Sequence, residues 1–98
     1  MLFSVRVTNH QSNVMLNICD ASLLGKTIVK DNYNVNISKS CYGERMVQKE
    51  EAEELLKKSS TINMVGKETI LLSTSLGIGS QSGVKEIDGV PFLLVFKI

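Results

Sequence analysis

The chain has 98 residues, of which 43% are hydrophobic and 21% charged, and this size and composition are typical of one globular domain spanning residues 1–98. Its 11 Lys and Arg residues nearly balance its 10 Asp and Glu residues. The resulting net charge of +1 excludes a strong overall field for wrapping nucleic acid or attaching to an anionic membrane. No stretch approaches the ~18 consecutive apolar residues of a membrane span, and no signal peptide is recognisable.

The two cysteines, Cys19 and Cys41, lie far apart in the sequence and have no second pair. This arrangement favours reduced thiols over a disulfide framework. We therefore expect a cytoplasmic protein without membrane contact.

Two alternating segments open the chain. Residues 3–7 and 14–19 each alternate apolar and polar side chains, with the polar turn Asn9–Asn13 between them, which predicts an antiparallel hairpin. Asp20 or Ser22 is expected to cap a single helical turn that ends at Gly25.

The middle of the chain changes from strand to helix periodicity. Alternation over Tyr33–Ser38 predicts a third strand, whereas apolar residues at helical spacing predict a helix over Gln48–Ser59, although Gln48 is a poor N-cap. The acidic run Glu50–Glu54 fits the solvated start of that helix better than a metal or substrate site. A short strand, Ile62–Val65, follows.

A second helix is expected from Lys67 or Glu68 to Leu76, and then a hairpin whose two-residue turn is Asp88-Gly89. Its last strand, Val90–Ile98, is almost entirely apolar, which predicts that both of its faces are covered. The fold class predicted is α+β: a single domain with a mixed or antiparallel sheet, about two helices packed on it, and β-hairpins at both ends.

No motif for catalysis, cofactor binding or metal binding emerges. Gly25-Lys26 resembles the end of a P-loop, but Asp20 stands where that motif needs a glycine. His10 and the two cysteines lack the close spacing of zinc ligands. We expect no catalytic residue, cofactor or metal.

Two polar positions are not explained by periodicity. Tyr42, in the loop Ser40–Arg45, either tucks over the core or lies beside Arg45 at a binding site. Asn63 lies in an apolar segment and either satisfies backbone groups between two helices, the commoner case, or presents its amide to a ligand.

Several blocks, taken together, resemble the archaeal domain-of-unknown-function family 424 (DUF424). The blocks are Cys19-Asp20, Leu23-Leu24-Gly25-Lys26, Tyr42-Gly43-Glu44, Glu50-Glu51, Asn63-Met64-Val65-Gly66 and Ile87-Asp88-Gly89-Val90-Pro91. The resemblance covers nearly the whole chain and implies a small α+β archaeal protein of the cytoplasm, without an established activity but described as RNA-binding. The family pattern has a histidine where this chain has Phe92 and an acidic residue where it has Lys67, which puts any role of that histidine in doubt here.

The family's polar blocks, with Arg45 added, define a candidate binding patch: Asp20, Lys26, Tyr42, Glu44, Arg45 and Asn63. Residues 1–49 carry six cations against three anions and residues 50–98 carry five against seven, so a weak, salt-sensitive contact is expected. The leading hypothesis is a non-catalytic binding module for RNA or a ribosome-associated particle.

The alternative is a protein interaction or assembly subunit, with the strand Tyr33–Ser38 as an edge that receives a partner strand. A third hypothesis is a small enzyme that uses Asp20, Glu44 or Cys41. The oligomeric state is left open.

Overall fold

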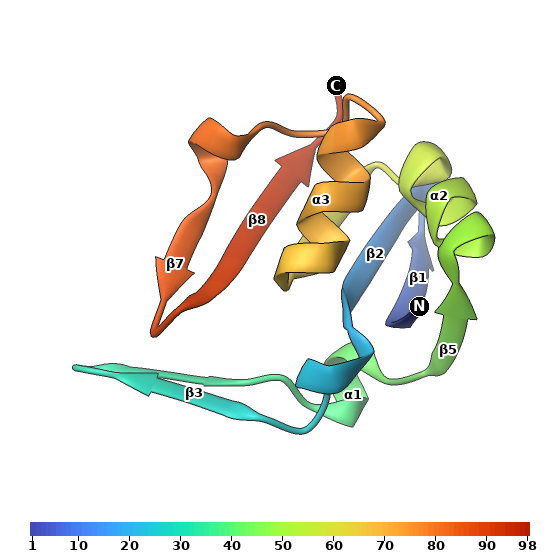
Figure 1. Ribbon diagram of the computed structural model, residues 1–98. Helices are drawn as coiled ribbons and strands as arrows, with labels where there is room; N and C mark the ends of the chain where they lie inside the picture. The colour runs from blue at the N-terminus through green and yellow to red at the C-terminus, as the bar shows by residue number, and fades with distance from the viewer.

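A six-stranded mixed sheet forms the centre of the computed structural model, which describes all 98 residues (Figure 1). The strand order is β5-β1-β2-β6-β8-β7, and all neighbours are antiparallel except β2 and β6. The strand bounds are β1 Leu2–His10, β2 Asn13–Asp20, β5 Arg45–Gln48, β6 Thr61–Val65, β7 Lys85–Ile87 and β8 Val90–Phe96. The α+β class is thereby confirmed, in its mixed-sheet form.

Both terminal hairpins are confirmed. Gln11 and Ser12 form the first turn with φ of 49° and 72°, and Asp88 and Gly89 form the second with φ of 50° and 79°. Positive φ at both central residues is the geometry that matches the twist of paired strands.

Helices α2, Lys49–Lys58, and α3, Lys67–Ser75, lie together on one face of the sheet (Figure 1). We call this side the helix face; its strands bury Phe3, Val5, Leu16, Ile18, Val47, Ile62, Met64 and Leu93 beneath the helices. The two predicted helices are confirmed to within a residue or two. Gln48 indeed makes no side-chain cap bond, but the other end of α2 is held by Lys97, whose Nζ donates to the carbonyl oxygens of Leu56 at 2.6 Å and Lys57 at 2.8 Å. No helix in this fold combines the length and apolar character needed to cross a bilayer.

A smaller layer covers part of the opposite face. It comprises the single turn η1, Ala21–Leu23, the two-stranded hairpin of β3, Thr27–Lys30, and β4, Tyr33–Asn36, and the short helix α1, Lys39–Tyr42. Ile28, Ile37 and Tyr42 from this layer pack on Cys19 and Val65 of the sheet and form a second core. Strands β3 and β5 and helix α1 were not expected from the sequence, because four residues are too few for a periodic pattern to stand out.

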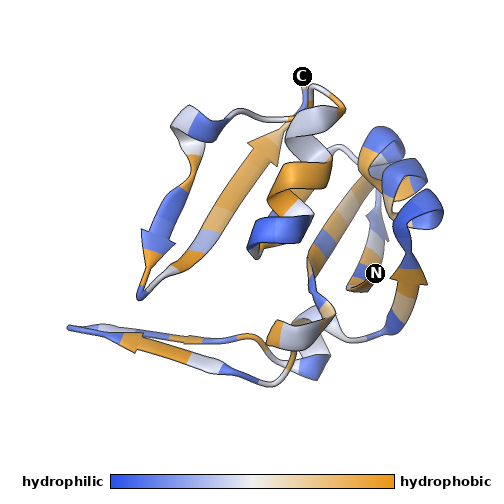
Figure 2. Cartoon of the chain, viewed as in Figure 1, coloured by the Kyte–Doolittle hydropathy of each residue, from blue (hydrophilic) through white to orange (hydrophobic).

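The prediction that both faces of the last strand are covered is wrong. Figure 2 shows β8 as a nearly continuous hydrophobic strand, yet Leu94 is 53% exposed and Phe96 is 68% exposed. The small layer reaches only as far as Phe92, which packs against the second core. The rest of β8 is covered on the helix face alone.

Asp20 joins the end of β2 to the start of α3. Its Oδ1 accepts hydrogen bonds from the Thr69 amide at 2.8 Å and the Thr69 hydroxyl at 2.7 Å, and its Oδ2 accepts from the Glu68 amide at 3.2 Å. Asp20 or Ser22 was expected to cap the turn at Ala21–Leu23; Asp20 does occupy the N-cap position, but its side chain makes no cap bond there. The carboxylate instead satisfies amides that begin a helix distant in sequence.

Gly66 is the residue that allows this contact. Its φ is +112°, and a Cβ at this position would lie 2.4 Å from Cγ of Asp20. Only glycine combines that backbone conformation with so close an approach.

Removing the cap is expected to destabilise the fold. Asp20→Ala should lower the free energy of unfolding by about 2 kcal/mol, the upper end of the range for a lost N-cap, whereas Asp20→Asn, which keeps an accepting oxygen, should cost less. Urea unfolding followed by circular dichroism measures both changes.

The same titrations test the role of Gly66. Gly66→Ala should destabilise the wild type, and its cost should be smaller in an Asp20→Ala background, because the carboxylate that the new Cβ meets has gone. Fully additive losses would contradict the proposed contact.

Candidate functional site

One part of the sheet surface has neither helices nor the small layer over it. We call it the open sheet face; strand alternation places there Arg6 and Thr8 of β1, Met15 and Asn17 of β2, Thr61 and Asn63 of β6, and Leu94 and Phe96 of β8. The same face of these four strands continues toward Cys19 and Val65, where the β3–β4 hairpin and α1 cover it.

The strand register arranges these side chains in two rows. One row runs Arg6, Asn17, Asn63, Leu94, and the next runs Thr8, Met15, Thr61, Phe96. Because adjacent strands are about 4.8 Å apart, each row spans roughly 14 Å, which is long enough for two or three nucleotides or a short peptide. The central positions on β2 and β6 are polar except for Met15, and both positions at the β8 end are apolar.

The two central amides differ in their partners. Asn17 Nδ2 donates a hydrogen bond to the carbonyl oxygen of Cys41 at 3.0 Å, which fastens α1 to the edge of this face. Asn63 makes no side-chain hydrogen bond within the chain, and no buried side-chain polar atom lacks a partner, so its amide is in reach of solvent. The expectation that Asn63 satisfies backbone groups between two helices is wrong, since it lies in the middle of a strand.

Charge is distributed unequally between the two sides of the molecule. The four strands that build the open sheet face place one charged side chain on it, Arg6, and no carboxylate. The carboxylate of Glu44 lies at the β1 edge of this face, where it accepts from the Val7 amide. Helix α2, on the other side, carries four glutamates and three lysines, which is a net charge of −1. An anion therefore meets less repulsion at the open sheet face than at the helices.

Cys41 lies at the border of this face. Hydrogen bonds from Ser38 and Ser40, and to a lesser degree the nearby charge of Arg6, lower the pKa of the exposed Cys41 thiol from its usual value. Cys19 is the opposite case, because burial raises the pKa of its thiol to about 12. Cys41 is therefore the more accessible and the more readily ionised of the two thiols.

Several of the candidate residues predicted from the sequence have structural roles. Asp20 caps α3, and its carboxylate occupies the amides with which that helix begins. Tyr42 is 7% exposed in the second core, burial raises the pKa of its phenol to about 12, and its carbonyl oxygen accepts a 2.7 Å hydrogen bond from Ser4 Oγ. Neither side chain is placed to touch a large ligand.

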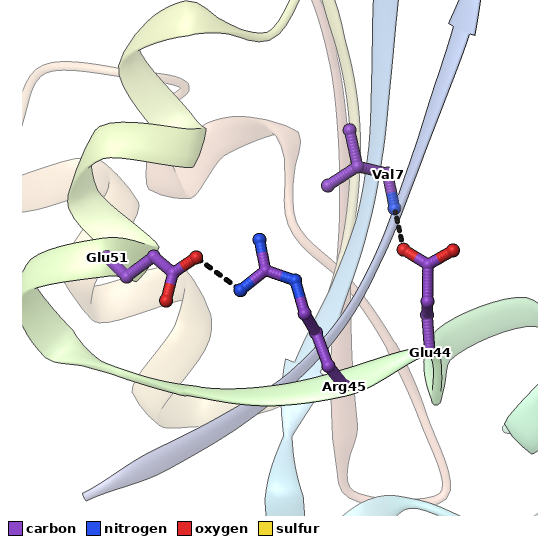
Figure 3. A network of polar contacts seen from close by, with 4 residues as sticks. All are labelled: Val7, Glu44, Arg45 and Glu51. Atoms are coloured by element: carbon purple, nitrogen blue, oxygen red, sulfur yellow. Dashed lines mark hydrogen bonds and ion pairs between the residues drawn. The ribbon is translucent and has the colours of Figure 1, made fainter.

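Glu44 and Arg45 point to different partners, as Figure 3 shows. Arg45 forms an ion pair with Glu51 of α2, and Oε1 of Glu44 accepts a long, 3.5 Å hydrogen bond from the Val7 amide. Lys26 is exposed between η1 and β3. The six predicted residues thus do not form one surface, and of them only Asn63 lies on the open sheet face.

Asp20, Glu44 and Cys41, the residues considered for an enzyme, do not line a common cavity. Two cavities of about 320 and 340 Å³ flank α3, and neither is lined by Asp20, Cys41 or Glu44. No three His, Cys, Asp or Glu side chains are grouped so that they could hold a metal ion.

The sequence reasoning missed Arg6, Asn17 and Phe96 as site residues. For Arg6 and Asn17 the strand alternation contained the information, because both occupy polar positions of the two predicted N-terminal strands. Which polar positions stay uncovered depends on the length of the small layer, and no local pattern reports that length.

Comparisons with known proteins agree with this fold. The crystal structure of an uncharacterized conserved protein from Methanopyrus kandleri superposes with a TM-score of 0.80 at 17% sequence identity, covering 100% of this chain and 95% of that one. At this identity the likeness shows the fold alone. A search of curated proteins gave no match. The family described as "Protein of unknown function (DUF424)" matches residues 7–98, and the chain belongs to that family.

Proposed function

We propose that this protein is a non-catalytic module that binds single-stranded RNA on the open sheet face, in the archaeal cytoplasm that the family resemblance implies. The observation that carries the proposal is the combination, in two adjacent rows, of an exposed aromatic ring, a cation and an unpaired amide on a surface whose strands bear no carboxylate. Single-stranded RNA is recognised on sheets by this combination of groups.

The aromatic ring supports base stacking. Phe96 is 68% exposed at the end of β8, and Leu94, the next side chain on the same face of β8, is 53% exposed. Met15, which is 44% exposed, lies two strands away, with Thr61 between it and Phe96. Stacking of a base on an aromatic side chain contributes about 1–3 kcal/mol and tolerates any base.

The polar groups support orientation of the strand. Asn63 has a free donor and a free acceptor, so its amide can pair with the edge of an unstacked base. Arg6 can contact a phosphate or stack on a base. With one cation on the face, few counterions are released, and the salt dependence of binding is expected to be shallow.

A duplex fits this surface less well. Double-stranded RNA is held mainly through its backbone along two successive grooves, which requires cations distributed over a long footprint. The open sheet face supplies one.

Substitution of the platform tests the proposal. Fluorescence anisotropy with labelled ten-nucleotide RNA at low salt should show that Phe96→Ala weakens binding at least about 5-fold, the lower limit expected for one lost stacking contact. Arg6→Ala should weaken binding and flatten its salt dependence. Since both side chains are exposed, neither change should alter the unfolding transition.

Matched controls lie on the helix side. Leu71 of α3 is 60% exposed, close to the value for Phe96, and Arg45 is paired with Glu51, so Leu71→Ala and Arg45→Ala should bind RNA as the wild type does. Absence of RNA binding at low salt, or a Phe96→Ala variant indistinguishable from Leu71→Ala, would exclude this site.

Cys41 provides an independent reporter at the border of the site. Without RNA, one thiol should react rapidly with Ellman's reagent and the second only after unfolding, because Cys19 is buried. Bound RNA should slow the fast reaction, since phosphates near Arg6 offset a charge that lowers the Cys41 pKa and also block access. A rate unchanged at saturating RNA would contradict binding at this face.

A further inference from the structure

The β3–β4 hairpin has an unpaired edge. It forms a two-stranded sheet separate from the main one, so β3 and β4 each have an outer edge without a partner strand, and β3 is the strand in contact with β7. In Figure 1 the hairpin extends well beyond the body of the molecule, below β7. Asn34 and Asn36 of β4 are exposed, and β4 pairs with no strand other than β3.

This edge lacks the features that keep other edges from pairing. The outer strands of the main sheet carry charges, Arg45 in β5 and Lys85 and Glu86 in β7. Strand β4, Tyr33–Asn36, has neither a charge nor a proline. Charged residues and prolines are the usual protection of an edge strand, and their absence leaves the backbone of β4 open to another strand.

The hydrogen-bond pattern identifies the outward backbone groups. The Ile37 amide donates to the Lys26 carbonyl at 2.9 Å, so the backbone N–H group of Ile37 points toward β3. In an antiparallel ladder the direction of the backbone N–H and C=O groups alternates from one residue to the next. Those of Val35 and Tyr33 therefore also point toward β3, whereas those of Asn34 and Asn36 point away from it.

From these features we infer that β4 pairs antiparallel with β4 of a second copy of this chain, giving a weak two-fold dimer through a continuous four-stranded sheet. With the axis at Asn34, Tyr33 of each copy lies opposite Val35 of the other. Aromatic and β-branched residues form favourable cross-strand pairs. Tyr33 is 62% exposed in the single chain. The dimer would contain two Tyr33–Val35 pairs, so the Tyr33 side chain of each copy would be partly covered by the other copy.

Charge at the two ends of the edge favours the same arrangement. Asp31 lies in the turn before β4, and Lys39 begins α1 shortly after it. Antiparallel pairing brings Asp31 of one copy to the end of the strand where Lys39 of the other copy lies. A parallel pairing would instead align like charges.

The dimer is expected to be weak and concentration-dependent. Four paired residues bury less than the ~1,200 Å² at which stable interfaces begin, the size class of weak and transient complexes. We therefore expect a Kd of roughly 10 μM to 1 mM. This inference does not depend on RNA binding, because the open sheet face is formed by other strands.

Analytical ultracentrifugation of the full chain between about 10 μM and 1 mM, without RNA, tests the dimer over that range. The wild type should pass from monomer to dimer. Asn34→Pro removes an outward N–H that β3 does not use and should weaken association at least about 10-fold, whereas the matched control Asn34→Ala should associate as the wild type does. Unchanged circular dichroism would show that the variants remain folded.

A second variant guards against a local effect of proline. Asn34→Lys places two like charges beside the axis and should weaken the dimer in a way that added salt partly reverses, whereas Gln81→Lys, with the same added charge on a distant exposed turn, should not. A monomer throughout would overturn the inference and leave the edge to a strand of another protein. A dimer insensitive to Asn34→Pro would overturn it too, because the contact would then lie elsewhere.

Discussion

The carboxylate of Asp20 is the contact on which the arrangement of the layers depends. It ends β2, the central strand that pairs with β1 on one side and β6 on the other, and it holds the first amides of α3, which follows β6. The approach is possible because Gly66 has no Cβ. This contact fixes α3 against the sheet at the residue where the chain leaves β6. With α2 capped by Lys97 at its far end, both helices are held on the same face. The opposite face can therefore be covered only by elements from the chain between β2 and β6.

On that face, the chain between β2 and β6 forms only a small layer. The β3–β4 hairpin and α1 contribute three buried side chains, Ile28, Ile37 and Tyr42, and these cover the end of the sheet around Cys19 and Val65. They cannot cover the rest, since the hairpin extends away from the body and α1 is four residues long. Exposure of Phe96 and of β4 is the common consequence. One is a sheet face that the layer does not reach, and the other is the outer edge of the layer itself.

Strand alternation and helical periodicity predicted most of the fold, because each acts over eight or more residues in β1, β2 and α2. The shorter elements, β3, α1 and β5, could not be predicted, since their positions depend on packing. The candidate site was harder for a related reason. Asp20 and Tyr42 were chosen because their side chains are chemically capable and had no core role in the pattern, but a capping contact and a second core account for both. Asn63 was chosen on the same ground and does face solvent. The difference between these residues is which layer lies over them, and that is a property of the tertiary structure.

The near-neutral charge of the chain limits what one RNA site of this kind can do. A face with a single cation gains little from counterion release, so its affinity depends on stacking and on the amide, and these contribute only a few kcal/mol together. Self-association through β4 would change that limit without adding any contact to the site, because two open sheet faces on one particle would bind a single RNA with a high effective concentration for the second contact. The gain would require an RNA long enough to span both faces and would vanish for shorter strands. Dependence of affinity on RNA length would then arise from the geometry of the dimer, whereas dependence on salt would stay small.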